Sequence, residues 1–241
     1  MPVRNHENPD DVDNPGGSPP CLMHELGPDG APADPQQIRD VARWRKAERE
    51  RLLTARLGLS AEYRAAQAAA IAADLDRLTP VAPETIISAY VSIRGEPDLR
   101  SWMRAKWEQG IRIALPVAVA LRQPLKFREW RPTGPLARGL WKIPYPADGM
   151  EVVPNVVLAP VVGFDADCYR LGYGGGFFDR TLAEAAEKPL VIGLAYPGAF
   201  ISTIFPQPQD IPMDWIVTGD GAPLRRGACL AKSPWLGESN D

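Results

Sequence analysis

Histidine, cysteine and long apolar runs are all scarce in this chain of 241 residues. Its two histidines, His6 and His24, both lie in a Pro/Gly-rich N-terminal stretch, so we expect the folded part to contain none. This absence argues against Ser-His-Asp hydrolysis, Cys-His proteolysis and histidine-ligated zinc. Chemistry in the folded part would then use carboxylates, arginine, lysine, tyrosine, backbone amides or a hard cation such as magnesium.

The three cysteines, Cys21, Cys168 and Cys229, are scattered and form no C-x-x-C pair. Such sparse, odd usage excludes a disulfide framework and a thiolate zinc site, and it is typical of a reducing compartment. No stretch approaches the roughly 18 apolar residues that cross a bilayer. The polar, acidic start of the chain differs from a secretory signal. We therefore expect a cytoplasmic protein with no membrane partner.

An excess of positive charge is also missing, because the formal net charge is −3. This balance argues against a nucleic-acid partner held by a basic face. Any anion is then bound by local geometry, and we expect small-molecule substrates. With 45% hydrophobic and 24% charged residues, the composition is that of an ordinary globular domain with a real core. We expect a monomer.

Composition and periodicity divide the chain into three parts. Residues 1–35 are rich in Pro, Gly, Asp and Asn and predict a flexible extension. Residues 36–222 predict a single α/β domain, and residues 223–241 a C-terminal tail. Helices are expected from Gln36 onward, then over Ala61–Leu78 with Ser60 as N-cap, Leu99–Glu108 and Phe177–Glu187. Strands are expected over Thr85–Ile93, Ile111–Pro116, Leu125–Arg131, Val156–Pro160, Leu190–Ala195 and Trp215–Thr218, with a Pro/Gly-rich loop running through Pro146.

The order of these elements indicates the fold class. A strand, a helix and a strand within about thirty residues make a βαβ unit with parallel strands. Leu125–Arg131 alternates between apolar and polar residues, which favours a half-exposed antiparallel strand. We therefore predict a three-layer α/β/α sandwich with a mostly parallel central sheet. Open sheets of this kind bind ligands beyond the carboxyl ends of their strands.

The segment RLGYGGGFFDR, Arg170–Arg180, places four glycines within five residues between two arginines. Glycine tolerates positive φ and lets backbone N–H groups approach a ligand, so the loop predicts an anion nest before a helix. Asp179 at its end could hold a cation. The dinucleotide fingerprint and the Walker pattern are both excluded, because Phe177 and Phe178 stand where they need other residues. The alternative is a tight turn, which needs one or two glycines rather than four.

With this loop and the basic first helix in view, the chain resembles the 5-formyltetrahydrofolate cyclo-ligase family, also called methenyltetrahydrofolate synthetases, from about Ala42 to Gly219. The resemblance is carried mainly by Pro160–Arg180, and it is supported by Gly95-Glu96, Phe127-x-x-Trp130, Ile143-Pro-x-Pro146 and Asp210-x-x-x-Asp214. It implies a Rossmann-like fold of the NagB/RpiA/CoA-transferase type. It also implies a ligase that uses ATP and Mg²⁺ to convert 5-formyltetrahydrofolate to 5,10-methenyltetrahydrofolate through a phosphorylated formyl intermediate, releasing ADP and phosphate.

The resemblance assigns roles residue by residue. The catalytic residues would be Arg170, Tyr173 and Asp179, and the magnesium ligands Asp179 and Asp210. ATP would contact Arg45, Lys46, Arg49, Arg170, Leu171, Gly172, Tyr173, Gly174, Gly175, Gly176, Phe177 and Phe178. The folate would contact Val91, Glu96, Tyr173, Gly174, Gly175, Gly176 and Phe177.

Some positions depart from the family pattern or leave alternatives open. Arg45 stands where the family has lysine, so either Arg45 or Lys46 takes that role. Phe177 and Phe178 stand where many members have tyrosine, which keeps stacking but removes a hydroxyl. Trp130 is either a folate wall or part of the core. Two other functions stay open: a related ATP-dependent enzyme with another small substrate, and a non-catalytic regulator that binds nucleotide or folate.

Overall fold

The computed structural model describes residues 35–80 and 82–228. The extension expected over 1–35 lies outside the described residues except for Pro35, and the tail lies outside them from residue 229 onward. His6 and His24 also lie outside them, and no histidine occurs in the described part.

A seven-stranded sheet forms the centre of the fold, with the strand order β11-β10-β9-β6-β1-β2-β3. The two outer pairs, β10 with β11 and β2 with β3, are antiparallel, and the other neighbours are parallel. The strands of this sheet are β1 (Ile86–Ser88), β2 (Arg112–Ala118), β3 (Leu125–Trp130), β6 (Val156–Pro160), β9 (Leu190–Leu194), β10 (Trp215–Val217) and β11 (Leu224–Arg225). This confirms the mostly parallel sheet and the antiparallel strand after β2.

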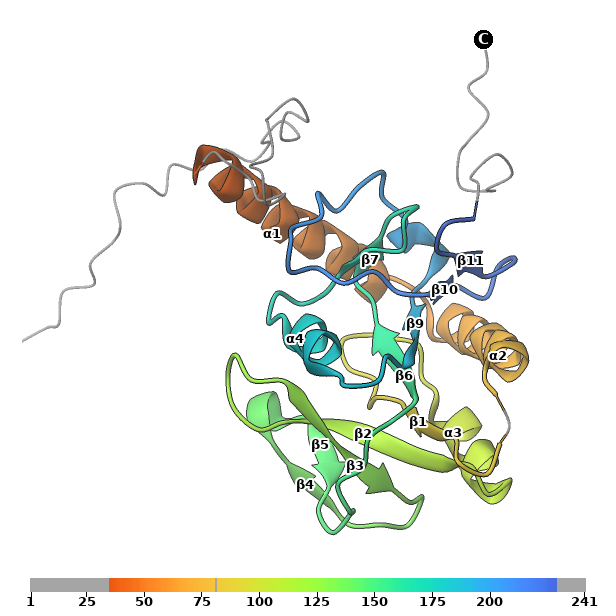
Figure 1. Cartoon of the computed structure of the whole chain (residues 1–241). Helices are drawn as coiled ribbons and strands as arrows, with labels where there is room; N and C mark the ends of the chain where they lie inside the picture. Colours follow the sequence, from red (N-terminus) through yellow and green to blue (C-terminus); the bar gives the residue numbers. More distant parts are fainter. Residues whose placement is uncertain (1–34, 81, 229–241) are drawn as a thin grey trace, which may run out of the picture.

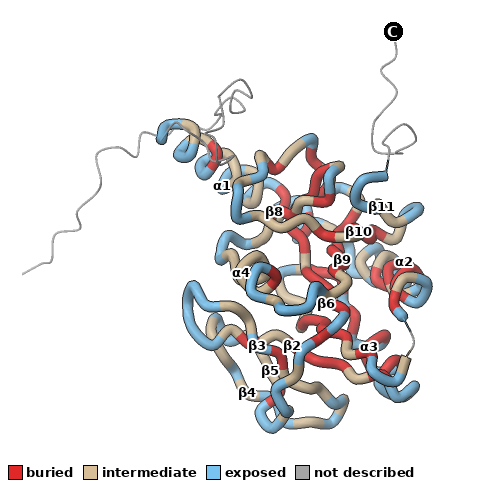
Figure 2. Tube along the Cα trace, viewed as in Figure 1, coloured by how far each residue is buried: buried red, intermediate tan, exposed pale blue. Residues whose placement is uncertain are grey.

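Helices cover both faces of the sheet (Figure 1). Side chains alternate along β6: Val156 and Leu158 pack with α2 (Ala61–Leu78) and α3 (Arg100–Glu108), whereas Val157 and Ala159 pack with α4 (Phe177–Glu184). Each face buries its own apolar cluster, as expected for a strand buried on both sides. The predicted three-layer architecture is therefore confirmed, and Figure 2 shows the central strands β6 and β9 as buried.

The first helix, α1 (Pro35–Leu57), packs away from the two sheet faces. Its Leu52 is buried with Val162 and Leu171, beside the small antiparallel hairpin of β7 (Gly163–Phe164) and β8 (Arg170–Leu171). This hairpin leaves no periodic pattern in the sequence, because each of its strands has only two residues. Asp165 caps the hairpin turn by accepting hydrogen bonds from the backbone N–H groups of residues 167, 169 and 204. The hairpin brings α1 against the segment that leads into the glycine loop.

The bounds of several elements differ from the expected ones. The helix Ala61–Leu78 is confirmed in full, and Ser60 caps it by accepting from the Tyr63 N–H at 3.1 Å. The strand expected over Thr85–Ile93 ends at Ser88, because the chain then leaves the sheet and turns at residues 93–96. The helix expected to reach Glu187 ends at Glu184.

Two loop regions contain strands that the sequence analysis missed. The Pro/Gly-rich loop holds a hairpin of β4 (Leu136–Arg138) and β5 (Pro144–Pro146), joined by the short 3-10 helix η1 (Leu140–Lys142). The edge strand β11 lies beyond residue 222, so the sheet extends past the domain boundary that composition suggested. A second 3-10 helix, η2, covers Pro197–Ala199. No described helix is long and apolar enough to cross a membrane.

Candidate active site

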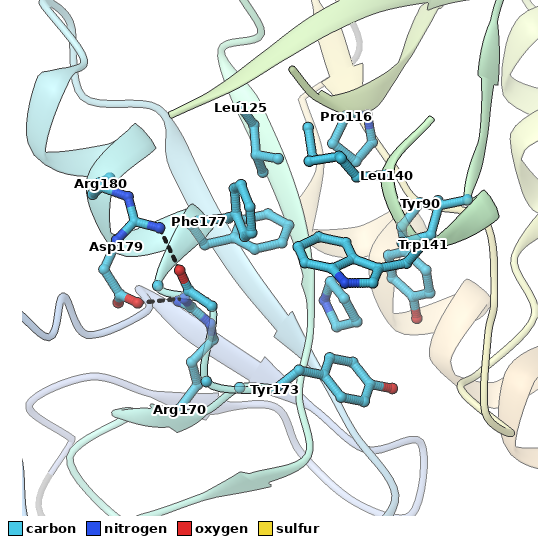
Figure 3. A pocket seen from close by; sticks show the side chains of 18 of the residues that line it. Tyr90, Pro116, Leu125, Leu140, Trp141, Arg170, Tyr173, Phe177, Asp179 and Arg180 are labelled. Carbon is cyan, nitrogen blue, oxygen red and sulfur yellow. Dashed lines mark hydrogen bonds and ion pairs between the residues drawn. The ribbon is translucent and has the colours of Figure 1, made fainter. Parts of the chain in front are cut away.

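A cavity of about 950 Å³ opens at the carboxyl ends of β1, β2 and β6. This is the edge at which open α/β sheets bind ligands, and the volume lies in the upper range of small-molecule sites. Its walls come from α1, the turn after β1, the loop around η1, the glycine loop with the start of α4, and residues 208–211. Figure 3 shows side chains from several of these segments pointing into one space.

The glycine loop has a backbone that other residues would strain. Gly174 and Gly176 have φ values of 92° and 62°, in the left-handed region that favours glycine. A Cβ at Gly175 would lie 2.8 Å from the ring of Phe177, which is too close for a real contact. Three of the four glycines are therefore required by the geometry of the loop itself.

Arginines hold the carbonyl groups of this loop and leave its amides free. The Arg49 Nε donates to the Gly172 carbonyl at 2.7 Å, and Arg180 donates to the Gly175 carbonyl. The backbone N–H groups of residues 172–178 have no hydrogen-bond acceptor within the described part of the chain. Unpaired N–H groups at the rim of a cavity and at a helix start form an anion-binding nest. The predicted loop geometry is present.

Arg170 lies beneath the loop and is buried. Its Nη2 donates to the Asp179 carboxylate at 2.9 Å, and its guanidinium lies 5.1 Å from the ring centre of Phe178. Its Nη1 is buried without a partner among the described residues. Burial lowers the pKa of the Arg170 guanidinium, and the carboxylates of Asp179 and Asp210 oppose that shift. A buried cationic donor without an acceptor is costly, so this atom points to an anionic ligand.

The second predicted metal ligand, Asp210, is also paired with an arginine. Arg45 forms an ion pair with Asp210 and donates to the carbonyl of Ile204 at 2.9 Å. Both partners have side chains only 12% exposed. Arg49 makes no carboxylate ion pair within the described residues. Three guanidinium groups thus face two carboxylates, which leaves a net positive charge beside the free amides.

The donor set fits magnesium that arrives with a nucleotide. Asp179 and Asp210 both line the cavity, but the described residues contain no group of three or more His, Cys, Asp or Glu side chains that could hold a metal alone. Mg²⁺ is usually held by one or two carboxylates together with substrate phosphates. Both carboxylates have arginine partners that would have to give way to the metal.

At the other end of the cavity, Glu96 is a buried carboxylate, only 3% exposed. The Tyr173 hydroxyl donates to its Oε1 at 2.7 Å, and the Ile93 N–H donates to its Oε2 at 2.9 Å. Burial raises the pKa of Glu96, whereas these hydrogen bonds and the charges of Arg56 and Arg94 lower it. Burial also raises the pKa of Tyr173, so its hydroxyl remains a donor at neutral pH.

The walls between these two ends are largely apolar. Val91 and Phe177 line the cavity together with Leu115 and Pro116 of β2. Trp141 of η1 packs edge-on against Phe177, with the ring centres 5.4 Å apart, although it is 60% exposed. Flat apolar walls of this kind suit a planar ring.

The structure brings together every predicted site residue except Lys46. Lys46 is exposed and lies outside the residues that line the cavity, whereas Arg45 lines it. This favours Arg45 for the role of the family lysine. Trp130 packs against the main apolar cluster, so it belongs to the core rather than to a folate wall. Cys168 is fully buried, and burial raises the pKa of its thiol to about 12, so it is not a nucleophile.

Three side chains at or beside the site were not predicted from the sequence: Arg56, Trp141 and Arg180. Arg180 was noted only as the end of the glycine segment, yet it lines the cavity and lies over the ring of Phe177 at 5.4 Å. Trp141 gave no periodic signal, because it lies in a Pro/Gly-rich loop. Arg56 could not be distinguished by sequence from the other arginines of the basic first helix.

The fold and the cavity define an α/β protein with a glycine-loop anion site next to a buried carboxylate. A family model described as the 5-formyltetrahydrofolate cyclo-ligase family matches residues 41–219. The chain belongs to this enzyme family.

Individual relatives and solved structures agree with this family. The 5-formyltetrahydrofolate cyclo-ligase of Escherichia coli K12 is 32% identical over 146 residues, which cover 58% of this chain and 80% of that protein. The one of Mycolicibacterium smegmatis is 32% identical over 140 residues, covering 55% and 72%. The solved structure of Aquifex aeolicus 5,10-methenyltetrahydrofolate synthetase aligns with a TM-score of 0.65 at 26% identity, covering 80% of this chain and 99% of that one. A synthetase structure from Mycoplasma pneumoniae, at 23% identity and a TM-score of 0.60, has the same fold.

Proposed function

We propose that this chain catalyses the ATP- and Mg²⁺-dependent cyclisation of 5-formyltetrahydrofolate to 5,10-methenyltetrahydrofolate, with release of ADP and phosphate. Membership of the cyclo-ligase family and the names of its relatives support this reaction. The observation that carries the proposal is one continuous cavity. It joins free loop amides and excess arginine charge at one end to a buried carboxylate at the other.

At the phosphate end, the free backbone N–H groups of residues 172–178 donate hydrogen bonds to the oxygens of the ATP phosphates. Arg49 and the unpaired Nη1 of Arg170 add full positive charge to these partial charges. Arg45 contributes from the same face of α1, one helical turn before Arg49. Phosphoryl transfer depends mostly on positioning and charge stabilisation, so a site without histidine is sufficient.

Asp179 and Asp210 would hold the magnesium ion that accompanies the nucleotide. When bound, the ion neutralises phosphate charge and orients the terminal phosphoryl group. Arg170 touches Asp179 and lies within the field of Asp210. With those carboxylates engaged, Arg170 would turn from Asp179, and Arg45 from Asp210, toward phosphate oxygens.

At the folate end, Glu96 accepts N–H donors from the edge of the pterin ring. A carboxylate fits paired N–H donors in the way that it fits a guanidinium group. Val91, Trp141 and Phe177 give the ring apolar and aromatic walls. Tyr173 lies between the two ends, because it belongs to the glycine loop and its hydroxyl touches Glu96. Tyr173 is therefore placed to contact both substrates.

The reaction then needs two steps. The formyl oxygen attacks the γ-phosphorus, the bond from that phosphorus to the bridging oxygen breaks, and ADP leaves. The amine at position 10 of the folate next attacks the activated formyl carbon and forms the new carbon–nitrogen bond. The carbon–oxygen bond to phosphate breaks, and phosphate and the amine proton are released. Holding the formyl oxygen in line with the γ-phosphorus is the main task of the glycine loop.

We further propose that the enzyme acts as a monomer in the cytoplasm. Residues of a single chain supply both the arginine-rich end and the buried carboxylate of the cavity, which is compatible with a monomer. The scattered cysteines, among which Cys168 is free and buried, support a reducing compartment.

The test is to mix the protein with MgATP and 5-formyltetrahydrofolate and to follow the absorbance of the methenyl product. Turnover that needs ATP, Mg²⁺ and the folate together is the expected result. ATP hydrolysis that responds only to another small substrate would indicate the related enzyme instead. Saturable nucleotide or folate binding without turnover would indicate a regulator.

A further inference from the structure

Arg56 is a buried arginine in the last turn of α1 that the proposed reaction has not used. It is only 6% exposed, and it does not line the main cavity. A buried guanidinium is rarely kept unless it is hydrogen-bonded or paired. The hydrogen-bond partners of Arg56 therefore indicate its role.

Arg56 touches three separate segments around the folate end. Its Nη1 donates to the carbonyl of Val161, just after β6, at 3.3 Å. Its Nη2 donates to the Tyr173 hydroxyl at 3.4 Å, and its guanidinium carbon lies 5.9 Å from the centre of that ring. Its side-chain stem lies beside Gly95, where an added Cβ would be 3.5 Å from the Arg56 Cγ. Arg56 therefore links α1 to the glycine loop and to the turn that carries Glu96.

These contacts form a directed chain of hydrogen bonds. Arg56 donates to the oxygen of Tyr173, and the Tyr173 hydroxyl donates to Glu96. With a donor fixed on its oxygen, the hydroxyl proton is directed toward Glu96, and each bond of such a chain polarises the next. The Ile93 N–H holds the other oxygen of Glu96.

The charge of Arg56 also acts on Glu96 directly, because it opposes the effect of burial on the pKa of that carboxyl group. The other titratable or charged groups around Glu96 are few. They are Arg94 in the same turn, Tyr90 in the segment after β1, Tyr173 in the glycine loop, Tyr196 after β9, and Arg64 of α2, which acts on Tyr196. Among them Arg56 and Arg94 are the cations that act on Glu96, and Arg94 is exposed.

We propose that Arg56 is a positioning residue for the folate end of the cavity. It directs the Tyr173 hydroxyl toward Glu96 and places a buried positive charge one hydrogen bond beyond that hydroxyl, so that the carboxylate is oriented to accept the N–H donors of the substrate. This inference rests on the proposed function, because it assigns Glu96 to folate recognition. It adds a residue outside the cavity wall on which the affinity for one of the two substrates depends.

The test compares Arg56→Met, which removes the charge, with Arg56→Lys, which keeps it. We expect Arg56→Met to raise the KM for 5-formyltetrahydrofolate about tenfold, the size of one lost hydrogen bond to a charged group. The KM for ATP should stay as in the wild type. Arg56→Met removes a cation that opposes the effect of burial on the pKa of Glu96, so this pKa should rise. The acid limb of kcat/KM for the folate should then move to higher pH. Arg56→Lys should return the limb toward its wild-type position.

Arg51→Met is the matched control, because Arg51 lies on the same helix but is exposed and paired with Glu48. Wild-type folate KM and an unmoved acid limb in folded Arg56→Met would overturn the inference. If Arg56→Met does not fold, Arg56→Gln serves in the same comparison. In a Glu96→Gln background, removal of Arg56 should leave the pH dependence unchanged, and a further shift there would also overturn the inference.

The outcome for Arg56 can be separated from that for the proposed function. A wild-type chain without turnover would contradict the function itself. In that case, calorimetric binding of 5-formyltetrahydrofolate at several pH values still compares Arg56→Met with the wild type. Equal affinities over the whole pH range would contradict the role of Arg56 by themselves.

Discussion

The two ends of the cavity handle charge in opposite ways. At the phosphate end, Asp179 and Asp210 are each paired with an arginine, and free backbone amides add to the excess of positive charge. At the folate end, a single carboxylate, Glu96, is buried against a tyrosine hydroxyl, with a guanidinium one hydrogen bond away. One end suits a multiply charged anion with its metal, and the other suits a neutral ring with N–H donors.

This difference indicates how two substrates can be bound independently and still meet. The backbone donors of the phosphate end come from one contiguous loop, with arginines of α1 and Asp210 beside it, whereas the folate end has no such contiguous segment. Tyr173 belongs to both, because it lies within the loop and its hydroxyl touches Glu96. Mutations at either end should therefore affect one substrate, while Tyr173 should affect both.

The largest effect is expected at the phosphate end for Asp179→Ala. Loss of this carboxylate removes a proposed magnesium ligand and leaves Arg170 without its ion-pair partner. We expect kcat to fall by about 100-fold or more, the scale seen when a preorganised electrostatic contact is removed. The protein should still fold, as judged by circular dichroism. Asp148→Ala, at an exposed surface ion pair, is the control, and a wild-type rate in Asp179→Ala would remove the metal assignment.

At the folate end, Glu96→Gln should act on one substrate alone. The amide keeps the shape of the side chain but loses the charge that accepts N–H donors, so we expect the KM for the folate to rise by about tenfold or more. The KM for ATP should change little. Steady-state kinetics with each substrate varied in turn gives both constants. An equal rise in both would mean that the two ends do not bind different substrates.

Arg49→Ala should give the opposite pattern. Arg49 holds the Gly172 carbonyl and carries a charge without a carboxylate partner among the described residues. We expect about tenfold weaker ATP binding by calorimetry, with folate affinity nearly unchanged. Arg51→Ala, from the exposed side of the same helix, is the control. Unchanged ATP affinity in Arg49→Ala would mean that α1 does not face the nucleotide.

A smaller effect is expected when the affinity for the folate is measured as a function of pH. The pKa of Glu96 is raised by burial, so this carboxylate becomes protonated above the usual range of carboxyl groups. Protonation removes an acceptor, and the affinity for the folate should therefore fall as pH is lowered through that raised pKa. ATP affinity should not follow the same curve. Folate affinity independent of pH across this range would contradict the role given to Glu96.

Much of the fold could be predicted from the sequence, because local patterns determine it. Ala61–Leu78 has a cap and an apolar stripe, and its bounds were correct. The strand expected to reach Ile93 stops at Ser88, and residues after it, such as Tyr90 and Val91, line the cavity instead of pairing in the sheet. This departure depends on tertiary contacts, which a local pattern does not show. The hairpin of β7 and β8 is too short to give a periodic signal. Nonetheless it is what brings α1 to the glycine loop.

The candidate site was predictable to the extent that it is contiguous. The glycine loop carries its geometry within ten residues, and two of its four glycines, Gly174 and Gly176, have positive φ in the structure. Arg56 could not be found in this way, because its contact with Tyr173 spans 117 residues and its helix contains other arginines. The pairing of Arg45 with Asp210 likewise depends on the final packing rather than on spacing.

The most direct test of the account labels the glycines with ¹⁵N and follows their amide signals as MgATP is added without folate. We predict that the signals of Gly172, Gly174, Gly175 and Gly176 shift in a saturable way, whereas those of remote glycines such as Gly110 and Gly221 stay in place. Binding of MgATP without movement of the four loop signals would contradict the claim that the loop amides hold its phosphates.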